Sequence, residues 1–230
     1  MRTAGLTKEY FGAPALAPLD LTVAAGERVT IIGHNGSGKT TLIRMLVGLL
    51  EASDGDATVG GAPIGSIEAR AAVSYISDQP VFYDDLSVWQ HLEYIGRLHG
   101  VDDWEQHAAD LLEAVGLTER AEDLPTTFSR GLKQKAQIAM GFARPFDLLL
   151  VDEPFVGLDR VGREALLELL RGAHADGAAL MVATHELATV REGTRLLALS
   201  GGRLVYDGPP GEADVAALTE GVAPTAAETE

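Results

Sequence analysis

A glycine-rich stretch at residues 33–40, GHNGSGKT, has the residue types and spacing of a phosphate-binding loop. A strand-like run (27–32) precedes it and a run with helical spacing (41–50) follows, so the loop lies where a helix begins. Its glycines let the backbone curl and direct N–H groups inward, and the helix N-terminus adds partial positive charge. Lys39 is then placed for the β- and γ-phosphates, and the Thr40 hydroxyl for Mg²⁺. A plain glycine-rich turn is the alternative, but the flanking pattern favours a nucleoside triphosphate site.

Two carboxylates, Asp152 and Glu153, directly follow the apolar run 148–151, which is typical of a central parallel strand. Beside a phosphate-binding loop, the first acid can reach Mg²⁺ directly or through water. The second can orient the water that attacks the γ-phosphate and take up part of its proton. An ordinary acidic turn is the alternative, and the nearby phosphate-binding loop makes it the less favoured one. The pair therefore predicts hydrolysis of the bound triphosphate.

Two further candidate sites depend more on their context. His185 follows a second apolar strand pattern (179–183), where its ring can touch the γ-phosphate and hold Glu153 and water in line. A lone histidine is more often structural or exposed to solvent. Ser129 and Gly131 lie at the start of a predicted helix, which makes a second possible anion site. From the residues alone, a plain helix cap is the favoured interpretation of Ser129.

The composition fits one α/β domain with an inserted subdomain: 230 residues, 46% of them hydrophobic. The 34 acidic residues outnumber the 18 basic ones, which gives a net charge of −16. This balance argues against a nucleic-acid surface and against direct attachment to anionic lipid. The chain has no cysteine, which excludes disulfides and thiolate metal sites. We find no signal-peptide pattern and no apolar run long enough to span a bilayer, so we expect no direct membrane insertion.

Periodicity places strands and helices along the rest of the chain. Short strand patterns near the N-terminus predict an antiparallel flap beside the nucleotide. Residues 86–124 become helical, with a capping box at Ser87 and Gln90, and a second helix that begins at Asp102 and ends at Gly116. The other predictions are strands at 19–23, 58–64 and 73–77, a hairpin of 196–199 with 203–206, and helices at 129–143 and 159–170.

Taken in order, these patterns resemble the ATP-binding subunit of an ABC transporter, from about Leu6 to Gly208. The matching motifs are an aromatic before the first hairpin, Walker A at 33–40, a Q-loop near Asp78, a helical lobe, a signature at 128–132, Walker B at 148–152 with Glu153, a D-loop at 157–159 and the switch residue His185. Motifs in this order are far more specific than any one of them.

The resemblance implies an α/β fold: a P-loop NTPase with a RecA-like, mostly parallel sheet core, an N-terminal antiparallel β subdomain and an inserted α-helical subdomain. Residues 1–208 would form the ABC-type ATP-binding domain, with the helical subdomain inserted at about 82–130. Residues 209–230 are rich in Ala, Glu and Thr and lack aromatics. We therefore expect them to form an acidic, flexible C-terminal tail.

The resemblance also implies a role for each matching position. Tyr10 would stack on adenine, with Phe11 as the less favoured alternative. Glu153 and His185 would be catalytic. The phosphate-binding residues would be Gly33, His34, Asn35, Gly36, Ser37, Gly38, Lys39, Thr40 and Thr41. The Mg²⁺ ligands would be Thr40, Asp78 and Asp152.

The implied assembly contains more than one chain. The signature residues Ser129, Arg130 and Gly131 would contact the ATP held by another subunit, and Asp159 would lie at the interface between the two. Hydrolysis would then need two ATP-binding domains placed head to tail, in a homodimer or in a heterodimer with another ATP-binding subunit. ATP and Mg²⁺ would be the cofactors. An integral membrane permease would hold the subunit on the cytoplasmic face of the cell membrane.

Two positions depart from the family pattern. The glutamine of the Q-loop aligns without gaps with Asp78, whose carboxylate is still a hard oxygen ligand for Mg²⁺. A slip of one residue would present Gln79 instead, and we favour Asp78. The signature, usually LSGGQ, has Arg130 for its first glycine and Leu132 for its glutamine. Because the phosphate-facing Ser129 and Gly131 remain, we expect activity to survive.

Other segments bear on the direction of transport and on the kind of partner. The signature and the segment 83–87, YDDLS, resemble drug- and lipid-export ATPases, which favours export over import. The apolar stretch 81–83 suits contact with a permease, and burial inside the helical lobe is equally favoured. One rival function is a soluble ABC-type ATPase that acts on nucleic acid or the ribosome, which the acidity disfavours. Another is a module that holds ATP without turnover, which Glu153 argues against.

Overall fold

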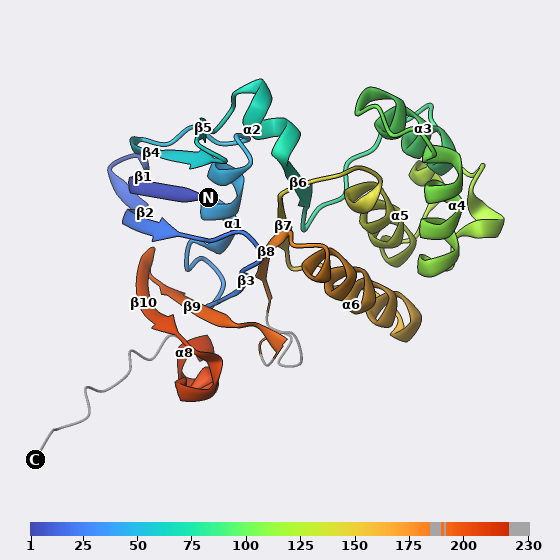
Figure 1. Cartoon of the computed structure of the whole chain (residues 1–230). Coiled ribbons are helices and arrows are strands. Elements are labelled where there is room, and N and C mark those ends of the chain that lie inside the picture. Colours follow the sequence, from blue (N-terminus) through green and yellow to red (C-terminus); the bar gives the residue numbers. More distant parts are fainter. Residues whose placement is uncertain (185–189, 191, 221–230) are drawn as a thin grey trace, which may run out of the picture.

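The computed structural model describes residues 1–184, 190 and 192–220, and these form two sheets and a set of helices (Figure 1). The strands are β1 (Arg2–Tyr10), β2 (Ala13–Thr22), β3 (Arg28–Ile32), β4 (Asp54–Val59), β5 (Ala62–Pro63), β6 (Val73–Ile76), β7 (Leu148–Asp152), β8 (Ala179–Ala183), β9 (Arg195–Ser200) and β10 (Arg203–Gly208). The helices are α1 (Lys39–Leu46), α2 (Ile67–Ala72), α3 (Val88–Leu98), α4 (Trp104–Val115), α5 (Arg130–Phe142), α6 (Arg160–Ala175) and α8 (Val215–Glu220). Short 3₁₀ turns are η1 (Thr118–Arg120), η2 (Pro125–Thr127) and η3 (Pro210–Glu212).

The smaller sheet is antiparallel, with the strand order β2-β1-β4-β5. Its β1–β2 hairpin pairs Leu6 with Leu19, and both leucines are buried. They belong to one apolar cluster with Leu42 and Leu46 of α1. The predicted antiparallel β subdomain is thereby confirmed, and it packs beside the helix that follows the glycine-rich loop.

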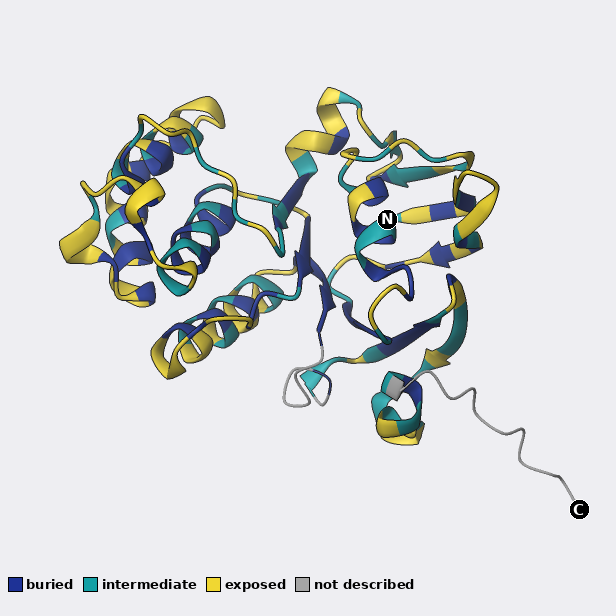
Figure 2. Ribbon diagram, turned by 180° about the vertical axis from the view of Figure 1, so that it is seen from behind, coloured by how far each residue is buried: buried dark blue, intermediate teal, exposed yellow. Residues whose placement is uncertain are grey.

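The larger sheet has the strand order β10-β9-β3-β8-β7-β6. Its neighbouring strands run parallel, except for the β9–β10 hairpin. Along β7, Leu149 and Val151 join one apolar cluster, while Leu148 and Leu150 join another on the opposite face. Every residue of β3, β7 and β8 is buried, as Figure 2 shows for the centre of the molecule. A parallel sheet covered on both faces is what the continuous apolar runs predict, so the α/β fold class is confirmed.

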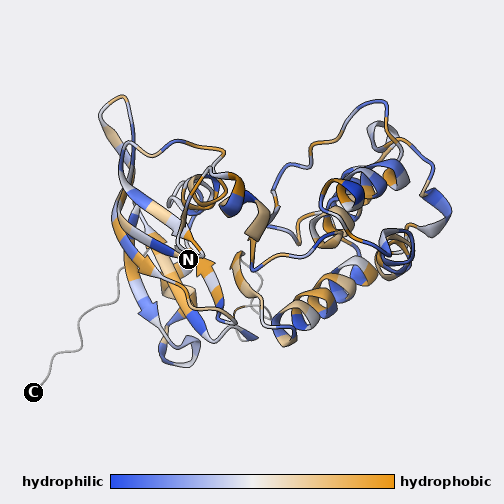
Figure 3. Ribbon diagram, turned by 45° about the horizontal axis from the view of Figure 1, so that its top comes forward, coloured by the Kyte–Doolittle hydropathy of each residue, from blue (hydrophilic) through white to orange (hydrophobic). Residues whose placement is uncertain are grey.

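A helical lobe lies between β6 and β7 in the sequence and at one side of the sheet (Figure 1). Ser87 and Gln90 form the predicted capping box at the start of α3. The second helix begins at Trp104 with Asp103 at its N-cap, so the expected start at Asp102 is two residues early. The indole of Trp104 is buried, and its packing fixes the first turn where no side chain caps it. Figure 3 shows the mixed hydropathy of these helices, and their buried apolar residues, such as Leu92 and Leu112, join one cluster.

The C-terminal region differs from the expected tail. Residues 210–212 form η3 and residues 215–220 form α8, so the expectation of a flexible tail from residue 209 is wrong for this segment. Leu218 is 2% exposed and shares an apolar cluster with Ile32 and Leu196, and Ala213 and Val215 also pack against this cluster. This burial explains why the segment folds against β9. Residues 221–230 lie outside the described residues. The described helices include none that is both long and apolar enough to cross a bilayer.

A pair of matched glycine substitutions tests the close approach of α3 and α4. A Cβ at Gly96 would lie 2.5 Å from the Cβ of Trp104, whereas one at Gly172 in α6 meets no atom within 4 Å. We expect Gly96→Ala to lower the free energy of unfolding by about 1–3 kcal/mol, because overpacking separates the helices. Gly172→Ala should raise it by about 0.5–1 kcal/mol, because alanine favours a helix. Urea unfolding of both variants measures this, and equal effects would contradict the described α3–α4 packing.

Candidate active site

One edge of the larger sheet gathers most of the predicted phosphate and carboxylate chemistry. The parallel register aligns Asp152 of β7 with Ala183 of β8, and Ala183 with Ile31 of β3. Because parallel strands end at the same edge, the loop after β3 meets the acidic pair after β7. Gly38 is the N-cap of α1, whose N-terminus therefore also lies at this edge.

The glycines of the loop are required by its backbone geometry. Gly36 and Gly38 have φ values of 80° and 106°, a region that side chains disfavour. A Cβ on Gly38 would also lie 2.9 Å from the carbonyl oxygen of Ala15. A Cβ on Gly33 would overlap the Leu199 carbonyl oxygen and lie 2.6 Å from the Ser37 hydroxyl. The loop is thus clamped between the β1–β2 hairpin and the end of β9.

Lys39 closes over this loop from the first turn of α1. Its ammonium donates to the carbonyl oxygen of Gly33 at 2.6 Å and to that of His34 at 3.4 Å. It also lies 3.8 Å from the Glu153 carboxylate. Burial lowers the pKa of Lys39, and the charges of Glu153 and Asp152 oppose that shift. The result is a buried positive charge held at the loop, where a phosphate group would complement it.

Asp152 is the most deeply buried acid of the site, with an exposed fraction of 0%. Burial raises its pKa, the Thr40 hydroxyl and Lys39 lower it, and Asp78 raises it further. Thr40 makes no well-directed hydrogen bond to it, and neither carboxylate oxygen has a hydrogen-bond partner among the described residues. A buried carboxylate without donors is costly. These oxygens therefore fit a hard cation such as Mg²⁺, bound directly or through water.

The Q-loop brings Asp78, rather than Gln79, against this cluster. The Asp78 carboxylate lies 3.4 Å from the Arg44 guanidinium. The negative charge of Asp78 raises the pKa of Asp152. Gln79 is exposed, and its carbonyl oxygen accepts from the Ser77 hydroxyl at 2.7 Å. Sequence reasoning missed Arg44, although its position one helical turn after Thr40 places it on the same side of α1.

Glu153 has an uncommon backbone conformation. Its φ is 45°, in the left-handed region that non-glycine residues rarely adopt, and its N–H donates to the Ala183 carbonyl oxygen at 2.8 Å. Such a conformation costs about 1–3 kcal/mol and is typical of functional sites. It turns the chain sharply after β7, so that Glu153 meets Lys39. The predicted switch residue, His185, lies outside the described residues.

The signature residues lie apart from the loop of their own subunit. Ser129 is the N-cap of α5 and accepts from the Leu132 N–H at 3.4 Å, and Arg130 is exposed. A Cβ on Gly131 would lie 2.6 Å from the Gly157 carbonyl oxygen. Within the part of the chain that the structure describes, no hydrogen bond or ion pair joins the three signature residues to residues 33–41.

Two other predicted positions have clear surroundings. Asp159 caps α6 by accepting from the Gly162 N–H at 2.7 Å, and its other oxygen accepts from Lys135 at 2.9 Å. The bond from Lys135, followed by that from Gly162, lowers the pKa of Asp159. Tyr10 is 45% exposed, with the Lys8 ammonium 5.3 Å from its ring centroid. Phe11, the alternative, is fully exposed at a turn with a φ of 51°.

Known proteins share both this sequence pattern and this fold. The family model described as ABC transporter matches residues 16–156. A putative ABC transporter ATP-binding protein of Halobacterium salinarum is 35% identical, over 95% of this chain and 97% of its own length. The SkfA peptide export ATP-binding protein SkfE of Bacillus subtilis is 33% identical, over 90% and 88%.

Solved structures agree with the sequence comparisons. A structure described as an ATP-binding subunit of an ABC transporter superposes with a TM-score of 0.86 at 31% identity, and covers 98% of this chain and 95% of its own. A dimeric bacterial ABC transporter cassette, MJ0796, has the same fold, with a TM-score of 0.83 at 24% identity, over 91% of this chain and 98% of its own. The chain therefore belongs to the ABC transporter family, as one of its ATP-binding, ATP-hydrolysing subunits.

Proposed function

We propose that the chain works as a dimer in which two ATP–Mg²⁺ molecules are bound between subunits, and that their hydrolysis powers an export permease. The observation that carries the proposal is the cluster at one sheet edge. There Lys39 lies 3.8 Å from Glu153, beside the buried and unpartnered oxygens of Asp152. Phosphoryl transfer to water requires a buried cation, a carboxylate that can bind a metal ion and a second carboxylate.

The proposed mechanism assigns one task to each group. Lys39, the loop amides and the α1 N-terminus offset the negative charge of the γ-phosphate. Thr40, Asp78 and Asp152 would hold Mg²⁺, which supplies Lewis-acid charge neutralisation when bound. Glu153 accepts a proton from the attacking water molecule. The oxygen of that water bonds to the γ-phosphorus as the bond to ADP breaks, and ADP leaves.

A dimer follows from the separation of the two halves of the site. Ser129 and Arg130 are exposed on their own subunit, at the N-terminus of α5, where backbone N–H groups and the guanidinium favour an anion. In the proposed arrangement they contact the ATP bound at the partner's loop. The chain carries one such loop and one signature, so each complete site needs two chains.

The surface after the Q-loop is proposed as the contact with the permease. Val81 is 81% exposed and Tyr83 is 56% exposed, while Phe82 packs into the lobe. The lobe thus buries Phe82, while Val81 and Tyr83 remain exposed for the proposed contact. Tyr83 also contacts Tyr94, which is 48% exposed and extends the patch. Export is favoured by relatives named for peptide export and for linearmycin resistance.

Replacing the proposed general base tests the hydrolytic step. We expect Glu153→Gln to lower ATP turnover by about 10²–10⁴-fold, because the amide cannot accept the proton from water. ATP affinity should be retained, because the side chain keeps its shape. Glu164→Gln, an exposed change on α6, is the control. Phosphate release and nucleotide binding measure the two effects, and unchanged turnover in Glu153→Gln would remove the assignment.

The two candidates in the Q-loop can be separated by their Mg²⁺ dependence. We expect Asp78→Asn to raise the Mg²⁺ concentration needed for half-maximal ATPase activity by about tenfold, since it removes a charged oxygen ligand. Gln79→Ala should leave this concentration unchanged. Titration of Mg²⁺ at fixed ATP provides the measurement. The opposite result would make Gln79 the residue that faces the metal.

Mixing two inactive variants tests whether sites are shared between subunits. Lys39→Ala removes the loop cation, and Ser129→Arg blocks the signature, so each variant alone should be inactive. A heterodimer of the two contains one intact site, and random pairing leaves about a quarter of all sites intact. We expect ATPase activity to return in the mixture in proportion to that fraction. Persistent inactivity, with mixed dimers detected by sedimentation, would argue against the shared site.

A further inference from the structure

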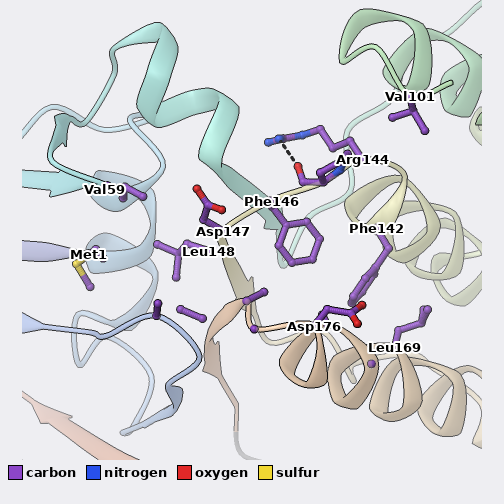
Figure 4. A pocket seen from close by; sticks show the side chains of 18 of the residues that line it. Met1, Val59, Val101, Phe142, Arg144, Phe146, Asp147, Leu148, Leu169 and Asp176 are labelled. Carbon is purple, nitrogen blue, oxygen red and sulfur yellow. Dashed lines mark hydrogen bonds between the residues drawn. The ribbon is translucent and has the colours of Figure 1, made fainter.

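A large cavity lies at the sheet edge opposite the candidate active site. Its volume is about 1040 Å³, and it is bordered by the helical lobe, by α6, by the first residues of β7 and β8, and by the N-terminal sheet (Figure 4). Val101 and Leu111 line it from the lobe, Leu148 and Ala179 from the larger sheet, and Val59 from β4. The volume is that of a site for a drug-sized molecule.

The walls of the cavity are mainly apolar and partly aromatic. Phe142 and Phe146 lie in a T-shaped pair, with ring centroids 5.9 Å apart, and Figure 4 shows both rings among the side chains that line the cavity. Leu169 of α6 adds a further apolar side chain to the lining. Aromatic faces attract organic cations, and apolar walls bind hydrocarbon groups. The shape and the lining thus suit a compact lipophilic molecule.

Helix polarity gives this edge a negative potential. α5 ends at Phe142 and α6 ends at Ala175, so the C-termini of both helices border the cavity. The carbonyl groups at a helix C-terminus carry partial negative charge. Asp176, the C-cap of α6, adds a full negative charge where the helix already disfavours one. The active-site edge has the opposite polarity, because α1 begins there.

Side-chain charges at the cavity reinforce this potential. Asp147 and Asp176 are exposed carboxylates that have no side-chain hydrogen bond or ion pair within the described part of the chain. A third acid, Glu168, is paired with Arg171 at 3.0 Å. The free carboxylates can therefore accept a cation from the cavity.

The cationic groups and the histidine at the cavity contact backbone carbonyl oxygens of the protein. The Arg144 guanidinium donates to the carbonyl oxygens of Ala71 at 2.6 Å, Pro145 at 3.0 Å and Arg70 at 3.1 Å, and also to that of Val73. Burial lowers the pKa of Arg144. The His107 ring contacts the Phe142 carbonyl oxygen at 2.8 Å, and the Met1 amino group donates to that of Val23. Each of these groups thus has a carbonyl partner, whereas the side chains of Asp147 and Asp176 have no partner within the described part of the chain.

We propose that this cavity binds a lipophilic organic cation, a molecule with an aromatic or alkyl body and one positive charge. The body packs on Phe142 and Phe146, and the negative charges of Asp147 and Asp176 attract the positive charge. An occupant contacts both the helical lobe and the sheet core, so it links two parts of the subunit at a site distant from ATP. The proposal is independent of the hydrolytic mechanism, since none of these residues lies at the phosphate-binding edge.

Two probe ions of nearly equal size and opposite charge test the proposal. Tetraphenylphosphonium and tetraphenylborate are titrated separately into the full chain by calorimetry, without nucleotide and in potassium-free buffer. We expect saturable one-to-one binding of tetraphenylphosphonium and at least tenfold weaker binding of tetraphenylborate. Absence of phosphonium binding up to its solubility would overturn the proposal. Equal affinity for both ions would overturn its electrostatic basis.

Charge-neutral variants locate the bound cation. Asp147→Asn and Asp176→Asn should each weaken phosphonium binding by about threefold, the size expected for one exposed charge pair. Phe146→Ala should weaken it further by removing an aromatic wall. Glu212→Gln, an exposed change on η3 away from the cavity, is the control and should bind like the wild type. Thermal unfolding confirms that each variant is folded. Unchanged binding in the Asp147→Asn, Asp176→Asn double variant would place the cation elsewhere and overturn the proposal.

Discussion

The burial of ionisable groups at the end of β7 is the constraint on which the rest of the structure depends. Asp152 is fully buried and Lys39 is 6% exposed, so each has lost most of its hydration. Charges in such a place are costly unless partners are held close to them. The apolar residues of β3, β7 and β8 supply this rigidity, because a sheet packed on both faces cannot shift one strand without opening a core. The site is thus a strained and costly feature supported by an ordinary hydrophobic core.

The same parallel sheet gives the subunit two edges of opposite electrostatic character. α1 begins at the edge where β3 and β7 end, and its N-terminus favours phosphate. α5 and α6 end near the edge where β7 and β8 begin, and their carbonyl groups favour a cation. This polarity comes from the backbone and its connections. Side chains then strengthen it, with Lys39 at one edge and Asp176 at the other.

Local patterns predicted most of the fold, because their physics is contained in a few neighbouring residues. The capping residues Ser87, Ser129 and Asp159 each accept the expected backbone N–H. Contacts between distant segments were not accessible in this way. The pairing of Arg44 with Asp78 and the cavity at the opposite edge arise only when several elements are assembled. The fold of residues 210–220 was missed because the partners of its short apolar side chains, such as Ile32 and Leu196 for Leu218, lie on β3 and β9, far away in the sequence.

The segment after β7 connects the proposed general base to the surface proposed to face the partner. It begins at Glu153, whose backbone is held in the left-handed region, and reaches Gly157, whose carbonyl oxygen leaves no room for a side chain at Gly131. Two residues later, Asp159 accepts from Lys135 on the same helix that Ser129 caps. A change in the backbone at Glu153 would therefore be resisted by the start of α5. In the proposed dimer, the contact of Gly157 with Gly131 makes the position of the signature depend on the backbone conformation of the segment after β7. The two ATP sites are then mechanically linked through backbone packing.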